Sequence, residues 1–135
     1  MKIVFSKSVT AVAFNLLAAS CSVALADPSH LTANSGKTLR LAFASEEKPD
    51  CTFAGMPVVH VVKDATHGRI RIQTEQAYPS FDEDNPRYFC NEWRVKGLGV
   101  YYTSDDGYVG DDFVSLHFDF GGGDETTDDY AITVQ

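Results

Sequence analysis

Positive charge is scarce in this sequence. Its 135 residues include 11 Lys and Arg against 19 Asp and Glu, which gives a formal net charge of −8 at pH 7. A surface that binds nucleic acid needs clustered Lys and Arg, because contacts to phosphate dominate the affinity. The composition therefore excludes a nucleic-acid partner. An acidic surface attracts cations and basic proteins, or it serves solubility alone.

Long apolar runs are missing as well. The strongest one, residues 9–17, is shorter than the roughly 20 residues that cross a bilayer. Lysines precede it and a small-residue triplet ending at Ala26 follows it, which is the order of an exported leader. We predict a signal peptide at residues 1–26, cleaved between Ala26 and Asp27, and no transmembrane segment in residues 27–135.

Removal of the leader makes the remaining chain more acidic and places it outside the cytoplasm. Two lysines and no acids are lost, so the formal charge falls to 9 − 19 = −10. We expect a secreted or periplasmic protein. A lipoprotein anchored through Cys21 is a less favoured alternative, because Leu17 lies four residues before this cysteine and lipoprotein sites usually place leucine three before it.

Cysteine is rare, and only Cys51 and Cys90 follow the leader. An oxidising exported compartment favours a bond between them. The bond would close a loop of about 40 residues and stabilise the domain by roughly 3–4 kcal/mol. Free thiols in redox or metal sites usually show a close Cys-x-x-Cys spacing, which this pair lacks. We predict one disulfide that staples two strands, with Trp93 filling the core nearby.

Catalytic motifs are also lacking. The sequence contains no serine nucleophile elbow, no Cys–His pair in the required context and no glycine loop that cradles phosphate. The three glycines at residues 121–123 precede acids and are interpreted as a flexible turn. Paired carboxylates for glycoside hydrolysis stay open, because only their separation in space identifies them. We predict that the protein is not an enzyme.

Helical periodicity is absent after residue 27, and short strand patterns are present instead. Residues 38–44 alternate apolar side chains with polar or small ones, which is typical of a strand with one solvated face. We expect further strands at residues 56–62, 68–74, 88–95, 100–103, 113–120 and 130–134. The terminus around His30 is expected to be loose. About seven short strands separated by Gly- and Asp-rich turns predict one antiparallel β-sandwich or barrel domain over residues 27–135.

A cluster of glycine, acidic and aromatic residues follows the pair Tyr101-Tyr102. It reads Gly107-Tyr108-Val109-Gly110-Asp111-Asp112-Phe113, and an earlier His67-Gly68 opens a strand. Over residues 58–134 this pattern resembles the bacterial Ig-like and cadherin-like domains of secreted and surface proteins. The resemblance implies an Ig-like antiparallel β-sandwich. It also implies a structural corner formed by His67, Gly68, Tyr101, Gly107, Tyr108, Gly110, Asp112 and Phe113, in which the glycines permit positive φ and the aromatics supply buried area.

Metal binding is a weaker possibility in this sequence. Calcium needs several oxygen ligands, and the acids come in clusters, of which Asp105, Asp106, Asp111 and Asp112 are candidates. Cadherin-like domains often depend on calcium, so the resemblance implies it as a candidate ligand, but the sequence has no Asp-x-Asp-x-Asp-Gly loop. Copper or zinc could use His60 and His117. We expect no required cofactor.

The favoured hypothesis is a non-catalytic exported module that binds other molecules or has a structural role. Its expected partner is a protein or a glycan, contacted through the aromatic residues Tyr78, Phe81 and Tyr88. One alternative is a small periplasmic protein that binds calcium, copper or zinc. A second alternative, from net charge alone, is an acidic inhibitor of a basic extracellular enzyme. The identity of the partner and the oligomeric state stay open.

Overall fold

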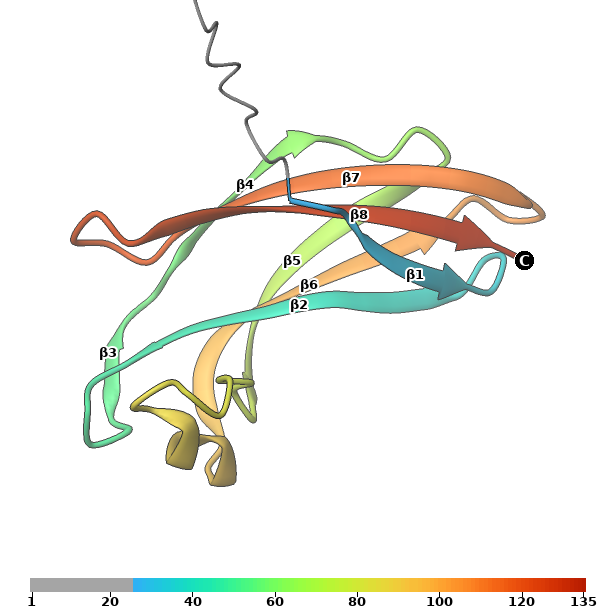
Figure 1. Cartoon of the computed structure of the whole chain (residues 1–135). Helices are drawn as coiled ribbons and strands as arrows, with labels where there is room; N and C mark the ends of the chain where they lie inside the picture. Colours follow the sequence, from blue (N-terminus) through green and yellow to red (C-terminus); the bar gives the residue numbers. More distant parts are fainter. Residues whose placement is uncertain (1–25) are drawn as a thin grey trace, which may run out of the picture.

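The computed structural model describes residues 26–135, and the leader predicted at residues 1–26, with Cys21, lies outside them except for Ala26. The strands are β1 (Ser29–Ala33), β2 (Thr38–Glu47), β3 (Phe53–Gly55), β4 (Val58–Lys63), β5 (Gly68–Ala77), β6 (Val95–Ser104), β7 (Gly110–Asp119) and β8 (Glu125–Val134), and a short 3-10 helix, η1, covers Tyr88–Glu92. They form two four-stranded sheets (Figure 1). The predicted all-β sandwich is confirmed, with eight strands rather than about seven.

The two sheets are built from strands that lie far apart in the sequence. The first sheet has the order β1-β8-β7-β4 and the second has the order β3-β2-β6-β5. β3 and β4 follow each other along the chain but belong to different sheets, and Pro57 lies between them. Proline cannot donate to a ladder, so it suits a position where the chain leaves one sheet for the other.

The hydrophobic core lies between the sheets. Alternate residues of the long central strands point inward, including Val100 and Tyr102 of β6, Val114 and Leu116 of β7, and Ile132 of β8. Burying a side chain of this size contributes about 1.5–3 kcal/mol. The strict alternation predicted for residues 113–120 is therefore the pattern of a strand with one face in this core.

The loose terminus predicted around His30 is wrong. Residues 29–33 form β1, which pairs in parallel with β8 from Ser29↔Tyr130 to Ala33↔Val134. Ala33 is buried, and Leu31 packs against the core. The local sequence shows little alternation, but the backbone hydrogen-bonding groups at the edge of β8 favour a further strand.

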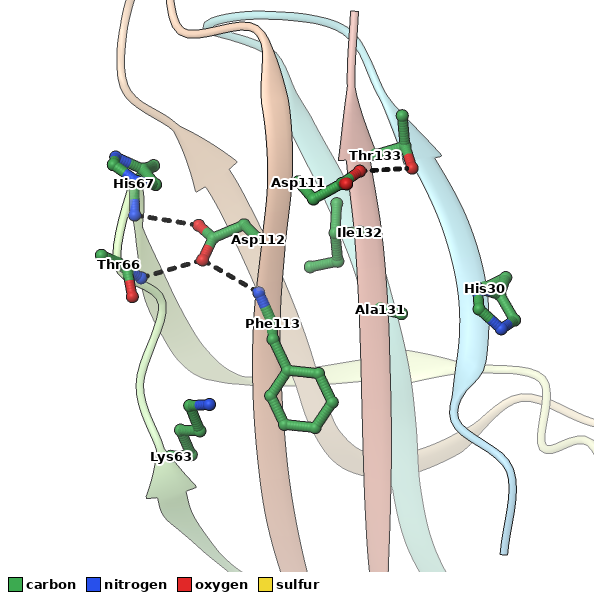
Figure 2. A pocket seen from close by; sticks show the side chains of 10 residues that line it. All are labelled: His30, Lys63, Thr66, His67, Asp111, Asp112, Phe113, Ala131, Ile132 and Thr133. Atoms are coloured by element: carbon green, nitrogen blue, oxygen red, sulfur yellow. Dashed lines mark hydrogen bonds between the residues drawn. The ribbon is translucent and has the colours of Figure 1, made fainter.

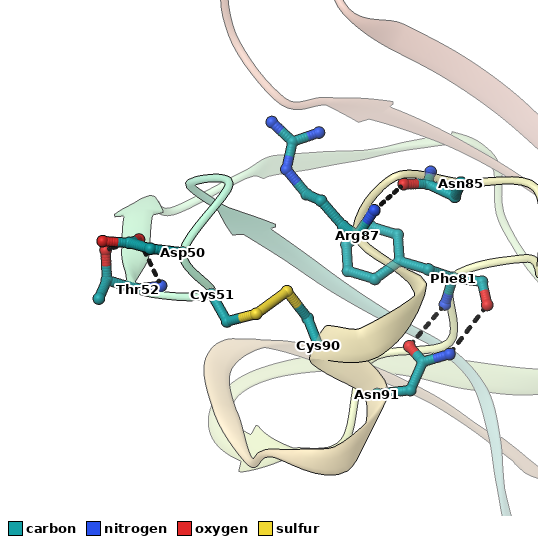
Figure 3. The surroundings of a disulfide bond; sticks show 8 residues. All are labelled: Asp50, Cys51, Thr52, Phe81, Asn85, Arg87, Cys90 and Asn91. Carbon is teal, nitrogen blue, oxygen red and sulfur yellow. Dashed lines mark hydrogen bonds between the residues drawn. A yellow bond between two sulfur atoms is a disulfide. The ribbon is translucent and has the colours of Figure 1, made fainter.

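The strand predicted at residues 88–95 is also wrong. Tyr88–Glu92 form η1, and β6 begins only at Val95. The predicted disulfide is confirmed: Cys51 and Cys90 are bonded, with their Cα atoms 5.4 Å apart (Figure 3). It joins η1 to the turn after β2, rather than joining two strands. Trp93 is 51% exposed, so its expected role as a core filler is wrong.

The two ends of β6 define two regions of the molecule. The ten residues of β6 span about 33 Å at 3.3 Å per residue. We call the region of residues 48–53 and 78–94 the disulfide end. We call the region of residues 64–68 and 105–113 the corner end. None of the helical structure described in residues 26–135 has the length and hydropathy of a membrane span.

Candidate functional site

The corner end is organised around the carboxylate of Asp112, which is 7% exposed. Its Oδ1 accepts hydrogen bonds from the backbone N–H of Thr66 and of Phe113, both at 2.9 Å (Figure 2). Its Oδ2 accepts from the N–H of His67 and from the hydroxyl of Tyr102, both at 3.0 Å. Burial alone would raise the pKa of Asp112, but these four donors outweigh it and lower the pKa.

Other residues of the predicted corner pack around this carboxylate. The rings of His67 and Tyr108 stack with centroids 4.1 Å apart, and the Tyr108 hydroxyl donates to the carbonyl of Asp111 at 2.7 Å. Gly107 has φ 78° and Gly110 has φ 142°, which are conformations that favour glycine. Both oxygens of Asp112 accept hydrogen bonds from the chain, so the carboxylate ties together the segments that surround it.

Tyr101 does not belong to the corner, although the sequence placed it there. Its neighbour Tyr102 faces the core and bonds Asp112, whereas the Tyr101 hydroxyl donates to Glu75 Oε2 at 2.6 Å. Arg40 Nη1 lies 3.3 Å from the other oxygen of Glu75. Tyr101 donates to Glu75 and lowers the pKa of this carboxyl, and Arg40 contributes to the shift. Adjacent strand residues face opposite sides, so only one tyrosine can reach the corner.

A large open cavity of about 550 Å³ lies beside the corner, on the outer side of the first sheet (Figure 2). Its lining includes His30, Lys63, Asp111 and Phe113. Lys63 Nζ lies 4.7 Å from the centre of the Phe113 ring, and Asp111 Oδ1 accepts a hydrogen bond from Thr133 at 3.1 Å. Two pairs of lining residues are therefore in contact, Lys63 with Phe113 and Asp111 with Thr133.

The candidate metal ligands are only partly brought together. His60 and His117 are direct partners in the β4–β7 ladder, with ring centroids 6.3 Å apart, and Glu125 Oε2 lies 3.3 Å from His117 Nε2. Both oxygens of Asp112 already accept hydrogen bonds from the chain, so neither is free to bind a metal ion. Among residues 26–135 no group of three or more His, Cys, Asp or Glu side chains is arranged to hold a metal ion.

The disulfide end carries five exposed aromatic side chains. Phe89 and Trp93 make an edge-on contact with centroids 6.2 Å apart, and Lys96 Nζ lies 5.6 Å from the Phe53 ring centre. We define the aromatic surface as Phe53, Tyr78, Tyr88, Phe89 and Trp93, the five exposed aromatic residues of the described chain. Tyr78 and Tyr88 were predicted as contact residues, whereas the exposure of Phe53, Phe89 and Trp93 was not predicted; Phe89 and Trp93 lay in an expected strand, and Trp93 was expected in the core.

The loop that carries this surface is held by covalent and polar contacts. The Asn91 side chain makes two hydrogen bonds to the backbone of Phe81, both at 2.9 Å (Figure 3): its Oδ1 accepts from the N–H, and its Nδ2 donates to the carbonyl oxygen. Asn85 Oδ1 accepts the N–H of Arg87 at 2.8 Å, and Cys90 is tied to Cys51. Phe81, the third predicted contact residue, is partly buried under the loop and lines a cavity there.

A second buried carboxylate lies beneath this loop, and sequence reasoning missed it. Glu47 is 2% exposed, and neither oxygen has a hydrogen-bond partner in the described chain. Burial raises the pKa of its carboxyl, and the nearby Ser45 hydroxyl, followed by the charge of Arg87, opposes that shift. The register of β2 slips between Glu46 and Glu47, which turns Glu47 inward. A bulge of this kind leaves no periodic signal in the sequence.

The comparisons with known proteins identify no family. No protein-family model and no curated protein matches the chain. Among solved structures, the solution structure of amebosin is similar over 78% of this chain and 88% of that chain, with 12% sequence identity and a TM-score of 0.39. At this score and identity, the likeness indicates neither a family nor a function.

Proposed function

We propose that this protein is an exported, non-catalytic Ig-like binding module that contacts a protein or a glycan through its disulfide end. The aromatic surface is the observation that carries the proposal. Aromatic side chains are the largest contributors to many interfaces, because they bury much area while losing few rotamers. Five of them are exposed at one end of this small sandwich, and exposed apolar area gathered in one region is typical of binding surfaces.

The construction of the loop supports a binding role. A ligand that binds a flexible loop must order it, and this ordering weakens affinity. Here the disulfide and the two hydrogen bonds of Asn91 hold the loop before any ligand arrives. A disulfide also agrees with an oxidising compartment outside the cytoplasm.

The order of the strands supports the Ig-like part of the proposal. Immunoglobulin sandwiches place strands B, E and D side by side in one sheet and C, F and G in the other. In this chain β2-β6-β5 and β4-β7-β8 are the corresponding neighbours. β3 is an addition to that plan, and β1 pairs with the last strand of the module.

Binding assays on glycan arrays and on fractionated extracellular proteins test this proposal. We expect saturable binding, accompanied by a shift in the fluorescence of Trp93, the sole tryptophan. The double variant Phe89→Ala, Trp93→Ala should abolish the binding. Val109→Ala should not, because Val109 is 69% exposed but lies at the opposite end. Undiminished binding by the double variant, or turnover of the bound ligand, would contradict the proposal.

A second candidate function is the binding of copper or zinc by His60 and His117, favoured by their direct pairing on the first sheet. Two protein ligands alone would hold the ion, with water completing its coordination. Equilibrium dialysis should then show a retained ion that is lost in His60→Ala and in His117→Ala. His30→Ala is the control, since His30 lies on β1 of the same sheet.

Calcium would instead require the exposed Asp105 and Asp106, and a melting temperature that falls when a chelator is added would reveal it.

A further inference from the structure

The pocket beneath the disulfide loop is lined by Glu47 and Arg87, whose charged groups do not bond each other. It has a volume of about 230 Å³ and lies between the end of β2, the loop and the β7–β8 hairpin. β2 contributes Glu47 and Ser45, the loop contributes Arg87 and Phe81, and the hairpin contributes Phe120 and Asp124. No ion pair joins Glu47 to Arg87 among the described residues.

Both charged groups have unused bonding capacity. The two oxygens of Glu47 and the Nε of Arg87 are buried without partners in the described chain. An ionised carboxylate only accepts hydrogen bonds, and a guanidinium only donates them. Leaving such groups unpaired in a buried site costs more than leaving neutral groups unpaired. Figure 3 shows the Arg87 guanidinium pointing away from the disulfide.

These requirements narrow the chemistry of a ligand. A ligand ammonium would donate to Glu47, but it has no lone pair for Arg87 and adds a second positive charge beside it. An anion would accept from Arg87 but would meet Glu46, Glu47 and Asp124, which outnumber the single arginine in the lining. A hydroxyl group can donate to the carboxylate and accept from the guanidinium at once.

The apolar part of the pocket adds a second requirement. Phe81 and Phe120 both line it. An adjoining cavity of about 190 Å³ shares Phe81, Phe120 and Ser45 and adds Phe43. A pyranose ring carries hydroxyl groups around its rim and apolar C–H groups on its faces, so it suits polar groups beside aromatic rings.

We infer that the pocket binds one neutral sugar residue of a glycan, whose neighbouring hydroxyl groups bond Glu47 and Arg87 while its ring packs against Phe81 and Phe120. This inference rests on the proposed function, and it names a glycan as the partner of the disulfide end. The adjoining cavity then receives the next sugar of the chain.

Two-dimensional NMR of the ¹⁵N-labelled protein tests the inference. The probes are glucose, galactose, mannose and N-acetylglucosamine, and the contrasting probes are glucuronate, butylammonium and N-methylacetamide. We expect at least one neutral sugar to shift the amide signals of Glu47, Phe81 and Arg87 saturably, and the contrasting probes to leave them unchanged.

Variants then assign the interaction to the two charged groups. Glu47→Gln and Arg87→Gln should each weaken sugar binding about tenfold or more, because each removes a hydrogen bond to a charged group. Arg69→Gln, which changes an exposed charge outside the disulfide end, should bind as the parent does. Glu47→Gln removes a buried charge and so should remain folded, which keeps the test decisive.

Other outcomes overturn the inference in distinguishable ways. Saturable shifts with butylammonium or N-methylacetamide, but not with sugars, would make the pocket a site for a protein side chain or backbone. Sugar-induced shifts confined to the Trp93 indole N–H would refute the pocket while leaving the proposed function intact. If sugars cause no saturable shift at the pocket or at Trp93, the inference is refuted. The proposed function would then be tested by whether a protein binds the aromatic surface.

Discussion

The two ends of the sandwich each bury a carboxylate, and the two carboxylates have opposite surroundings. Asp112 at the corner end accepts four hydrogen bonds, three of them from backbone N–H groups. Glu47, next to the disulfide end, has no hydrogen-bond partner of good geometry in the described chain, and only the Ser45 hydroxyl lies near enough to lower its pKa. The pKa of Asp112 is lowered and the pKa of Glu47 is raised. Burial is common to both, so the difference comes from the donors that the chain supplies.

This difference separates a structural role from a binding role. A carboxylate with every lone pair engaged stabilises the fold and has nothing left for a ligand. A buried carboxylate without donors reduces stability, and a ligand that brings donors recovers that loss. The Asp112 bonds join β7 to β6 and to the segment between β4 and β5, so the corner end links the two sheets, whereas the unpaired Glu47 agrees with the binding role that we propose for the disulfide end.

The largest expected effect comes from removing the carboxylate of the corner. Asp112→Asn replaces an accepting oxygen by a donor that faces donors, and it should lower the free energy of unfolding by about 3–5 kcal/mol. Urea denaturation at neutral pH measures it. The matched variant Asp111→Asn changes an exposed neighbour with one side-chain bond, and it should cost about 0.5 kcal/mol. Equal losses in the two variants would contradict the structural role of Asp112.

Acid should remove the contribution of Asp112. Its pKa is lowered in the folded state, so the stability it provides is present above the unfolded pKa of 3.8 and is lost as the pH falls through the folded pKa. The difference in unfolding free energy between the parent and Asp112→Asn should therefore shrink below pH ~4. A difference that stays constant down to pH ~2 would show that the charge is not what stabilises the corner.

Loss of the disulfide should have the next largest effect. The sequence separation of Cys51 and Cys90 is 39, and a closed loop of this length stabilises by about 3–4 kcal/mol in the chain-entropy model. The double variant Cys51→Ala, Cys90→Ala should lose that amount in urea denaturation. Hydrogen exchange should rise at the amides of residues 78–94 and stay slow in β7, because only the first segment is held by the bond. Uniformly faster exchange would contradict a local role.

The sequence predicted those parts of the fold that depend on local periodicity or on compartment chemistry. β2, β5, β7 and β8 each alternate along their own length, so their existence was visible without knowledge of their partners. The bond between Cys51 and Cys90 followed from their number and the expected oxidising compartment. The corner was implied by the resemblance to Ig-like and cadherin-like domains, and two of its glycines, Gly107 and Gly110, have positive φ.

The parts that could not be predicted depend on contacts made far along the chain. β1 exists because β8 offers an unpaired edge 100 residues later. Residues 88–92 follow a strand-like pattern, yet the disulfide and the turn hold them in η1. The choice between Tyr101 and Tyr102 and the inward turn of Glu47 depend on register, since a shift of one residue exchanges the two faces of a strand.

A stabilising substitution should distinguish the disulfide end from the corner end. Glu47→Met keeps the length of the side chain and removes both unpaired oxygens, so it should raise the free energy of unfolding by about 1–2 kcal/mol at neutral pH. Burial raises the pKa of Glu47 in the folded state. The carboxyl is therefore neutral and leaves stability at its maximum below pH 4.5, the unfolded pKa, and stability is lost as the pH rises through the folded pKa. The gain in Glu47→Met should therefore appear only at the higher pH. A loss at neutral pH would show that Glu47 is bonded in solution.

The smallest effect on stability is expected where the proposed effect on binding is greatest. Trp93 is half exposed, so Trp93→Ala should change the free energy of unfolding by less than about 0.5 kcal/mol. Leu116→Ala, in the core of β7, should cost about 2–5 kcal/mol in the same measurement. The sequence had placed Trp93 in the core, where its truncation would cost about 3–5 kcal/mol. A loss of that size would show that the Trp93 side chain is buried in solution and does not belong to the aromatic surface. A negligible loss, together with lost binding, would mean that the largest side chain of the chain is kept on the surface for its contacts with a partner.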